Sequence, residues 1–285
     1  MTPISIRHIL TVYALLLSTL LAGAQVIDTD TVQSRYRVAA TMFGIGRQKA
    51  LDTYLSPFQY AGPEASFLRE TMRLTRFDRR LSVQSLFRVY AAMPGRYGYD
   101  IYTGLVNWNY GMHYRLAIGD NLKLLFGGMG DLNAGFIYNP RNSNNPASAK
   151  AFIDLDASAM AIYHFRLGRY HMTARYQANM PMAGLMFSPD YGSSYYEMFY
   201  LGYRANTIKF TSLHNHLSLR QMLTLDFPLR GVTLRAGYYW EIEQSHVNHL
   251  KTHTYSHTFM LGFVRHIKLI RDRHSKPMPA AINPF

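Results

Sequence analysis

Apolar and polar residues alternate along the segment 232–242 (VTLRAGYYWEI). Its even positions carry Val, Leu, Ala, Tyr, Trp and Ile, whereas its odd positions carry Thr, Arg, Gly, Tyr and Glu. Because successive side chains of a strand point to opposite faces, the segment predicts a β-strand with one apolar and one polar face. Aromatic residues crowd one end of the apolar face, which is typical of a strand in the wall of a membrane-spanning barrel.

The same alternation recurs along the chain in segments separated by polar turns. The short turns are 77–80, 118–121, 166–169 and 228–231. The connections 139–149 and 243–251 are longer, and short turns at one end with longer loops at the other are typical of outer-membrane barrels. The predicted fold is therefore all-β: a transmembrane antiparallel up-and-down β-barrel of about ten strands, with short periplasmic turns and longer extracellular loops. The expected strands are 32–43, 65–76, 81–92, 100–117, 122–138, 151–166, 170–183, 212–226, 231–243 and 253–268.

Two alternatives concern this architecture. If 195–211 adds a hairpin to the wall, the number of strands becomes twelve. A soluble β-sandwich also alternates, but its apolar faces pack against a second sheet. Export and aromatic-rich apolar faces favour the membrane.

The N-terminus predicts export. Arg7 and His8 precede an apolar stretch at 9–21 and a small-residue cleavage site at 22–24, the pattern of a secretory signal peptide over 1–24. A retained anchor helix is the alternative. The barrel then covers 25–270, and 271–285 forms a short basic, Pro-containing periplasmic tail. The expected location is the outer membrane of a Gram-negative bacterium.

Charge and cysteine content narrow the expected partners. The chain has no Cys, so it is stabilised without disulfides, and its formal net charge is +13. On an exported barrel this balance favours outer-membrane lipid and lipopolysaccharide phosphates over nucleic acid. We expect a monomer without a cofactor.

Strand parity assigns a set of charged side chains to the interior. A barrel of about ten strands is small enough to be filled by its own side chains, and buried charges need partners. We therefore expect a lumen filled by Arg–carboxylate pairs, with a narrow anion-preferring pore as the alternative. Arg35, Arg37, Arg69, Arg73 and Lys123 are further basic residues with this parity. The expected charge network comprises Arg88, Arg115, Asp131, Asp154, Asp156, Arg175, Arg220, Asp226, Arg235 and Glu241.

Two constellations could carry chemistry. His216 and Ser218 share one strand face, as in hydrolases where His activates a Ser hydroxyl. Their neighbours Leu217 and Leu219 take the apolar face, however, so the pair is expected to point into the lumen and not at lipid. The second group consists of histidines near the outer ends of the last strands, which could bind Zn²⁺ or Cu²⁺ or be merely solvated. This group is His214, His246, His249 and His253.

The segment 182–211 is expected to be the largest outer loop, and it is rich in aromatic residues. Exposed aromatic rings suit contact with carbohydrate, lipid or protein, so the loop is the candidate binding surface. Alternatively, the loop folds over the barrel mouth, together with 44–64, and buries its rings. The candidate residues are Tyr191, Tyr195, Tyr196, Phe199 and Tyr200.

Three motifs carry a resemblance to a known family: 52–57 (DTYLSP), 195–202 (YYEMFYLG) and 212–215 (SLHN). With them, nearly the whole mature chain resembles an uncharacterised outer-membrane barrel family of Bacteroidetes, domain of unknown function 3316. The resemblance implies an exported barrel and no assigned activity. We expect a structural or surface-binding role and no enzyme, with the pore and a lipid-modifying hydrolase as alternatives.

Overall fold

Ten long antiparallel strands form the wall of the protein in a computed structural model that describes residues 36–75, 78, 80–143, 145–203, 206–229 and 232–268. The predicted signal peptide and the C-terminal tail lie outside these described residues. The ten strands are β1 (Tyr36–Asp52), β2 (Ser56–Leu74), β3 (Leu81–Ala92), β6 (Tyr102–Ile118), β7 (Leu122–Tyr138), β8 (Ala147–Leu167), β9 (Tyr170–Phe187), β11 (His216–Leu229), β12 (Val232–Val247) and β13 (Leu250–Lys268).

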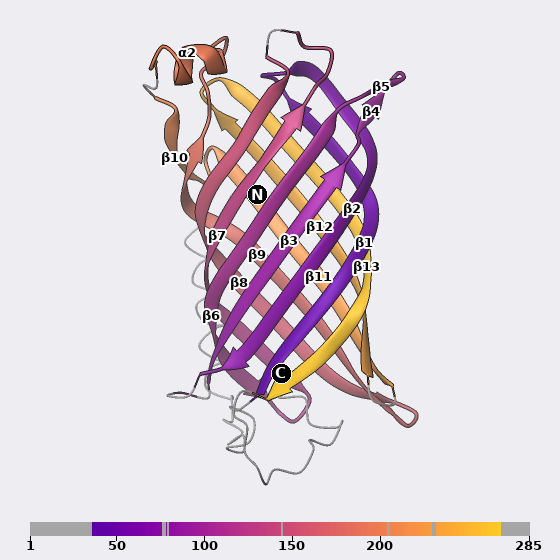
Figure 1. Cartoon of the computed structure of the whole chain (residues 1–285). Helices are drawn as coiled ribbons and strands as arrows, with labels where there is room; N and C mark the ends of the chain where they lie inside the picture. The colour runs from indigo at the N-terminus through magenta and orange to yellow at the C-terminus, as the bar shows by residue number, and fades with distance from the viewer. Residues whose placement is uncertain are drawn as a thin grey trace, which may run out of the picture.

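The wall closes on itself. Each long strand pairs with its neighbour in sequence, and β1 pairs with both β2 and β13, so the strands form a complete ring (Figure 1). The predicted ten-stranded up-and-down barrel is confirmed. The twelve-stranded alternative is wrong because β10 (Ile208–Ser212) pairs with β9 outside the ring. Closure pairs every long strand on both sides, as the membrane interior requires.

The short turns lie at one end of the barrel, where β1 starts and β13 ends (Figure 1). The opposite end, called the loop end here, carries the two-stranded hairpin β4 (Gly95–Arg96) and β5 (Tyr99–Asp100), the connection 139–146, and the connection 188–207. The last contains the short helix α2 (Tyr195–Phe199). None of the helices in the described part of the chain is long and apolar enough to cross a membrane.

Two connections expected to be long loops are tight turns. Residues 44–64 continue β1 and β2 and leave only 53–55 between them. Likewise β12 and β13 continue to a two-residue turn, where Asn248 and His249 have φ of 50° and 63°. Positive φ at both central residues suits the tightest hairpins, whose twist matches that of the strands they join. Polar residues therefore continue these strands beyond the membrane and do not mark loops.

The seam between the first and last strands depends on close backbone approach. A Cβ atom on Gly46 of β1 would lie 1.9 Å from the carbonyl oxygen of His257, and one on Gly262 of β13 would lie 2.0 Å from that of Thr41. Backbone atoms cannot move aside as a flexible side chain can. Glycine at these two positions lets β1 and β13 meet.

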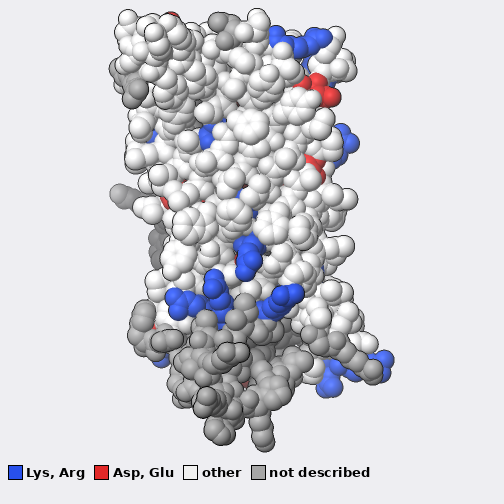
Figure 2. Space-filling view, viewed as in Figure 1, with Lys and Arg blue, Asp and Glu red and all other residues white. Residues whose placement is uncertain are grey.

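The outside of the wall is apolar in its middle and basic toward the short-turn end. On the face shown in Figure 2 the middle band carries few charges, and Lys and Arg gather toward the lower end. Phe43, Phe259 and Leu261 are 63%, 69% and 71% exposed. An outward apolar band with aromatic residues matches the lipid-facing surface of a transmembrane barrel.

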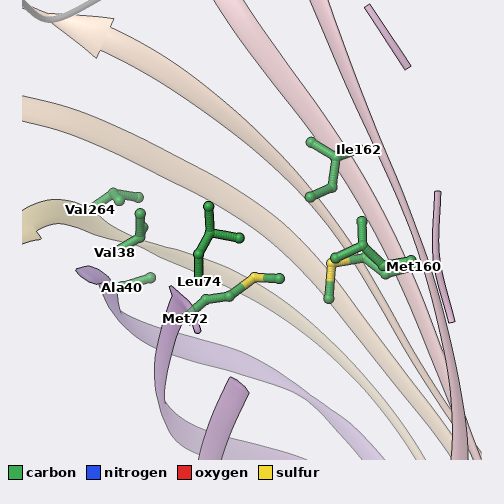
Figure 3. Packing of buried hydrophobic residues seen from close by; sticks show 8 residues of the cluster. Val38, Ala40, Met72, Leu74, Met160, Ile162 and Val264 are labelled. Atoms are coloured by element: carbon green, nitrogen blue, oxygen red, sulfur yellow. The ribbon is translucent and has the colours of Figure 1, made fainter. Parts of the chain in front are cut away.

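The interior is built of alternating apolar and polar layers. Nearest the short turns, Val38, Met72 and Ile162 belong to an apolar cluster that also includes Leu125. Its members come from β13, β1 and β2 and, across the interior, from β7 and β8 (Figure 3). A second apolar layer, which includes Leu86 of β3, lies further toward the loop end. Charged side chains occupy the levels on either side of this second layer.

Candidate functional site

The lumen contains all ten charged residues of the expected network. Each of them is at most 8% exposed. Three further arginines expected inside, Arg37, Arg69 and Arg73, lie on the outer face instead. Their parity was misread because the inward face is apolar at this level, with Val38 on β1 and Met72 on β2 pointing into the lumen. The inward face of β2 carries Glu64 and Glu70, which the parity argument missed although they share a face with Leu68 and Met72.

The charged layer nearer the loop end crosses the lumen as a chain of ion pairs. Arg88 lies 2.6 Å from Glu64 and 2.8 Å from Glu241, and Glu241 lies 2.7 Å from Arg220. Arg220 in turn binds Asp131. These five residues come from β2, β3, β12, β11 and β7, so the chain ties opposite sides of the barrel together.

Aromatic and hydroxyl groups complete this layer. The guanidinium of Arg88 lies 4.3 Å from the ring centre of Tyr239 and 4.7 Å from that of Tyr90. Ser256 and Thr258 of β13 donate hydrogen bonds to Glu64 at 2.6 and 2.9 Å. Such contacts compensate the loss of water around the buried charges.

The charged layer nearer the short turns is balanced. Glu70 binds Arg175, and it lies 2.7 Å from Arg235. Arg235 also holds Asp226 through two parallel hydrogen bonds of 2.6 and 2.7 Å. Two guanidinium groups therefore face two carboxylates. A cavity of about 10 Å³ beside this layer has room for about one water molecule.

Arg88 offers a direct test of the ion-pair chain. Replacing it with Met should lower the free energy of unfolding by about 3–5 kcal/mol, because Glu64 and Glu241 lose a buried cationic partner. Denaturant unfolding of the refolded barrel measures this difference. The matched variant Arg69→Met, on the exposed outer face of the same barrel, should leave stability nearly unchanged. Equal losses in both variants would contradict the assignment.

A group of three buried carboxylates lies beside the charged layer nearer the loop end. Asp131, Asp154 and Asp156 each offer an oxygen within 4.8 Å of the others. Asp131 accepts hydrogen bonds from Asn107, at 2.5 Å, and Asn109. Both oxygens of Asp154 and of Asp156 are buried and accept no hydrogen bond from any described residue.

The pair His216 and Ser218 points into the lumen, and the two side chains are 1% and 0% exposed. His216 Nδ1 lies 3.7 Å from Asp154 Oδ2, and its ring meets Phe152 edge-on with centroids 5.2 Å apart. No hydrogen bond joins His216 to Ser218, whose hydroxyl has no partner among the described residues. This geometry lacks both the activated hydroxyl and the access to lipid that a lipid hydrolase needs.

The outer histidines do not gather into a metal site. His214, His246 and His249 are exposed, and His214 Nδ1 lies 2.6 Å from the Ser212 hydroxyl. His253 stacks on Tyr255 with ring centroids 4.8 Å apart. Within the described part of the chain, the one group of three or more His, Cys, Asp or Glu residues close enough to share an ion is the Asp131, Asp154 and Asp156 group.

The loop 188–207 is partly folded over the rim and partly exposed. Ser194 and Glu197 form a capping box that starts α2, and hydrogen bonds from Ser194 hold the pKa of Glu197 below its usual value. Tyr195 packs edge-on against Tyr54, with ring centroids 5.8 Å apart, and its hydroxyl accepts a hydrogen bond from Ala149 N at 2.6 Å. The helix is thereby fixed to the barrel.

Tyr54 provides a second attachment of this loop. Burial and the neighbouring Tyr195 and Asp52 raise the pKa of Tyr54 to about 12. Its hydroxyl therefore stays protonated, and it donates to the carbonyl oxygen of Ser193 at 2.8 Å.

The outward side of α2 exposes the other predicted aromatic residues. Tyr196 and Tyr200 are 60% and 75% exposed and stack on each other with centroids 4.8 Å apart. Tyr191 and Phe199 are also exposed. The two expectations for this loop each hold for some of its rings. Tyr195 packs on the barrel and Phe199 stacks on Tyr195 and Phe187, while Tyr191, Tyr196 and Tyr200 are exposed.

A groove of about 1580 Å³ lies on the outside of the wall, toward the loop end. Arg47 and Lys49 of β1 line it, and both are exposed. The other residues lining the groove include the small side chains of Ala61, Pro63 and Ala65 and the rings of Trp240, Phe259 and Phe136. Trp240 was expected on an apolar outer face, but Ala61 and Pro63 fall in 44–64, which was expected to be a loop, so the sequence did not predict the groove.

A closed wall, an apolar exterior and a charged interior define a transmembrane β-barrel of the outer-membrane type. The chain belongs to the family described as protein of unknown function DUF3316, whose model matches residues 9–274. The family resemblance predicted from the sequence is confirmed, whereas its bacterial phylum stays a prediction.

Solved structures similar to this chain are barrels of several kinds. The transport unit of the autotransporter AIDA-I from Escherichia coli is 7% identical with a TM-score of 0.43, covering 87% of this chain and 97% of that chain. The outer membrane protease OmpT from Escherichia coli is 6% identical with a TM-score of 0.43, covering 84% and 99%. An outer membrane channel from Pseudomonas putida F1 is 8% identical with a TM-score of 0.33, covering 85% and 100%. A search of curated proteins finds no match.

Proposed function

We propose that this protein is a non-conducting outer-membrane barrel that acts through its outer surfaces. The observation that carries the proposal is the filled lumen, in which ion pairs from opposite strands meet across the interior. A cavity of about 20 Å³ near the loop end and one of about 10 Å³ near the short turns interrupt this packing. Each has room for about one water molecule, whereas a hydrated ion needs a continuous wider path.

Conductance is the direct test. The purified barrel in a planar lipid bilayer should give no stable current steps, because the Arg88 and Arg220 ion pairs block the lumen. A porin reconstituted in the same way serves as the positive control. Reproducible steps with anion selectivity would instead support the narrow pore.

We propose that the first working surface is the exposed side of α2. The stacked rings of Tyr196 and Tyr200 present a flat apolar face with hydroxyl groups at its edge, and the capping box and Tyr195 hold the helix in place. Rigid, exposed aromatic side chains are efficient anchors because little conformational freedom is lost on binding. A carbohydrate fits such a surface, since sugar rings have apolar faces and polar edges.

A glycan array tests this surface. The wild-type protein should bind at least one class of oligosaccharide, and Tyr196→Ala/Tyr200→Ala should weaken that binding at least about tenfold, because two aromatic anchors are lost. Tyr97→Ala is the matched control, since Tyr97 is 85% exposed in the β4–β5 hairpin. Unchanged binding by the double variant would remove α2 from the proposal.

We propose that the outer groove is the second working surface and takes a phosphorylated lipid of the outer leaflet. Its apolar floor and aromatic walls suit acyl chains, while Arg47 and Lys49 offer two cations to phosphate groups. The other large groove on the wall, about 630 Å³ and lined in part by Val106, Leu132 and Ile153, has no charged lining residue. Charge therefore favours the first groove as the lipid site.

Lipid A binding tests the groove. Arg47→Ala/Lys49→Ala should weaken the binding of lipid A to the barrel in detergent about tenfold or more, because two cations that contact phosphate are lost. Removing the phosphate groups from lipid A should weaken its binding to the wild type by a similar factor. Arg37→Ala/Arg265→Ala is the matched control, because it removes two exposed outer arginines near the short-turn end. Equal weakening in both variants would mean that attraction to the anionic lipid is unspecific.

A further inference from the structure

The part of the lumen near the loop end holds more carboxylates than its arginines neutralise. Arg88 and Arg220 are the guanidinium groups that contact carboxylates there. Near the short turns, by contrast, two arginines face two carboxylates. The carboxylates near the loop end are Asp52, Glu64, Asp131, Asp154, Asp156, Glu241 and Glu243, and Lys150, which lies 2.7 Å from Asp52, is a further cation there.

The excess negative charge is concentrated on Asp154 and Asp156. Their side chains are 2% and 4% exposed, and all four carboxylate oxygens lack a hydrogen bond from any described residue. Burying an ionised carboxylate without a partner costs several kcal/mol. Neighbouring Asp131 is fully engaged by Arg220, Asn107 and Asn109 and cannot supply a donor.

The three carboxylates have the spacing of a cation site. Their nearest oxygens lie within 4.8 Å of one another. Oxygens bound to Ca²⁺ lie about 2.3–2.6 Å from the ion, so two on opposite sides of it are about 5 Å apart. His216 is a second, independent indication: it is 1% exposed, its Nδ1 lies 3.7 Å from Asp154 Oδ2, and its Nε2 has no partner among the described residues.

The backbone is shaped around these carboxylates. The register of β8 and β9 shifts between Leu155 and Asp156, and Pro181, which has no N–H, faces Asp156. A Cβ atom on Gly184 would lie 1.8 Å from Asp154 Oδ1. Bulges are frequent next to functional sites because they redirect side chains. Here the bulge and the glycine make room for two adjacent inward carboxylates.

We propose that Asp154 and Asp156 bind one divalent cation of the Ca²⁺ or Mg²⁺ class, with Asp131 and His216 beside it. The oxygen-rich ligand set favours these hard cations over Zn²⁺. The ion balances the two charges of Asp154 and Asp156, at the place where side chains of β7, β8 and β11 meet inside the barrel. Phe152, whose ring contacts His216, lines the cavity of about 20 Å³ toward the loop end, so the site lies next to that cavity.

Calorimetry and thermal unfolding test the site on the full refolded barrel. After EDTA treatment, titration with Ca²⁺ should show one bound ion per chain, and unfolding should shift upward by several degrees when the ion is about 100-fold above its Kd. Asp154→Asn/Asp156→Asn should abolish both effects. Without cation this variant should unfold at or above the temperature of the wild type, because it removes the uncompensated charges.

The control is Asp100→Asn, which removes an exposed carboxylate of β5 and should keep the full Ca²⁺ response. Two outcomes would overturn the proposal. One is a wild type that binds neither Ca²⁺ nor Mg²⁺. The other is a double variant that responds like wild type, which would place the ion on the surface. Neither of these outcomes depends on the glycan or lipid results.

Discussion

The need to pair buried charges inside a narrow closed barrel governs the rest of the structure. Ten strands leave an interior that side chains can fill, and a charged group that points inward needs a partner there. The strands meet this need in register. Along β3, Gln84, Leu86, Arg88 and Tyr90 contribute in turn to a polar, an apolar, a polar and an apolar level. The ion pairs thus form between levels of apolar packing that exclude water.

This arrangement separates what holds the barrel together from what meets its surroundings. Arg88 and Arg220 form ion pairs with carboxylates inside the barrel, so their guanidinium groups are not available to bind a solute. Outside, Arg47 and Lys49 lie on a groove, and Tyr196 and Tyr200 project from a helix fixed at the rim. The surfaces that can bind a partner are therefore those that the filled lumen leaves free.

Much of this fold follows from the alternation of the sequence, and the exceptions have physical causes. Strong alternation, as in 232–242, predicted the strand, its faces and the inward Arg235 and Glu241. On β2 the rule gave the wrong face, since an inward apolar level puts Leu68 and Met72 inside while Arg69 and Arg73 lie outside. Polarity alone cannot assign a face when the interior is charged and the rim is basic.

The seam between β1 and β13 has a consequence for assembly. Glu64, in the second strand, accepts hydrogen bonds from Ser256 and Thr258, in the last one, and Arg88 binds both Glu64 and Glu241. Ser256 and Thr258 lie 192 and 194 residues from Glu64 along the chain, so Glu64 lacks these two donors until the final strand has docked. Loop-closure entropy makes such distant contacts slow to form. An unclosed sheet would present its charged interior to lipid, which is costly, so closure favours the inserted state of this barrel.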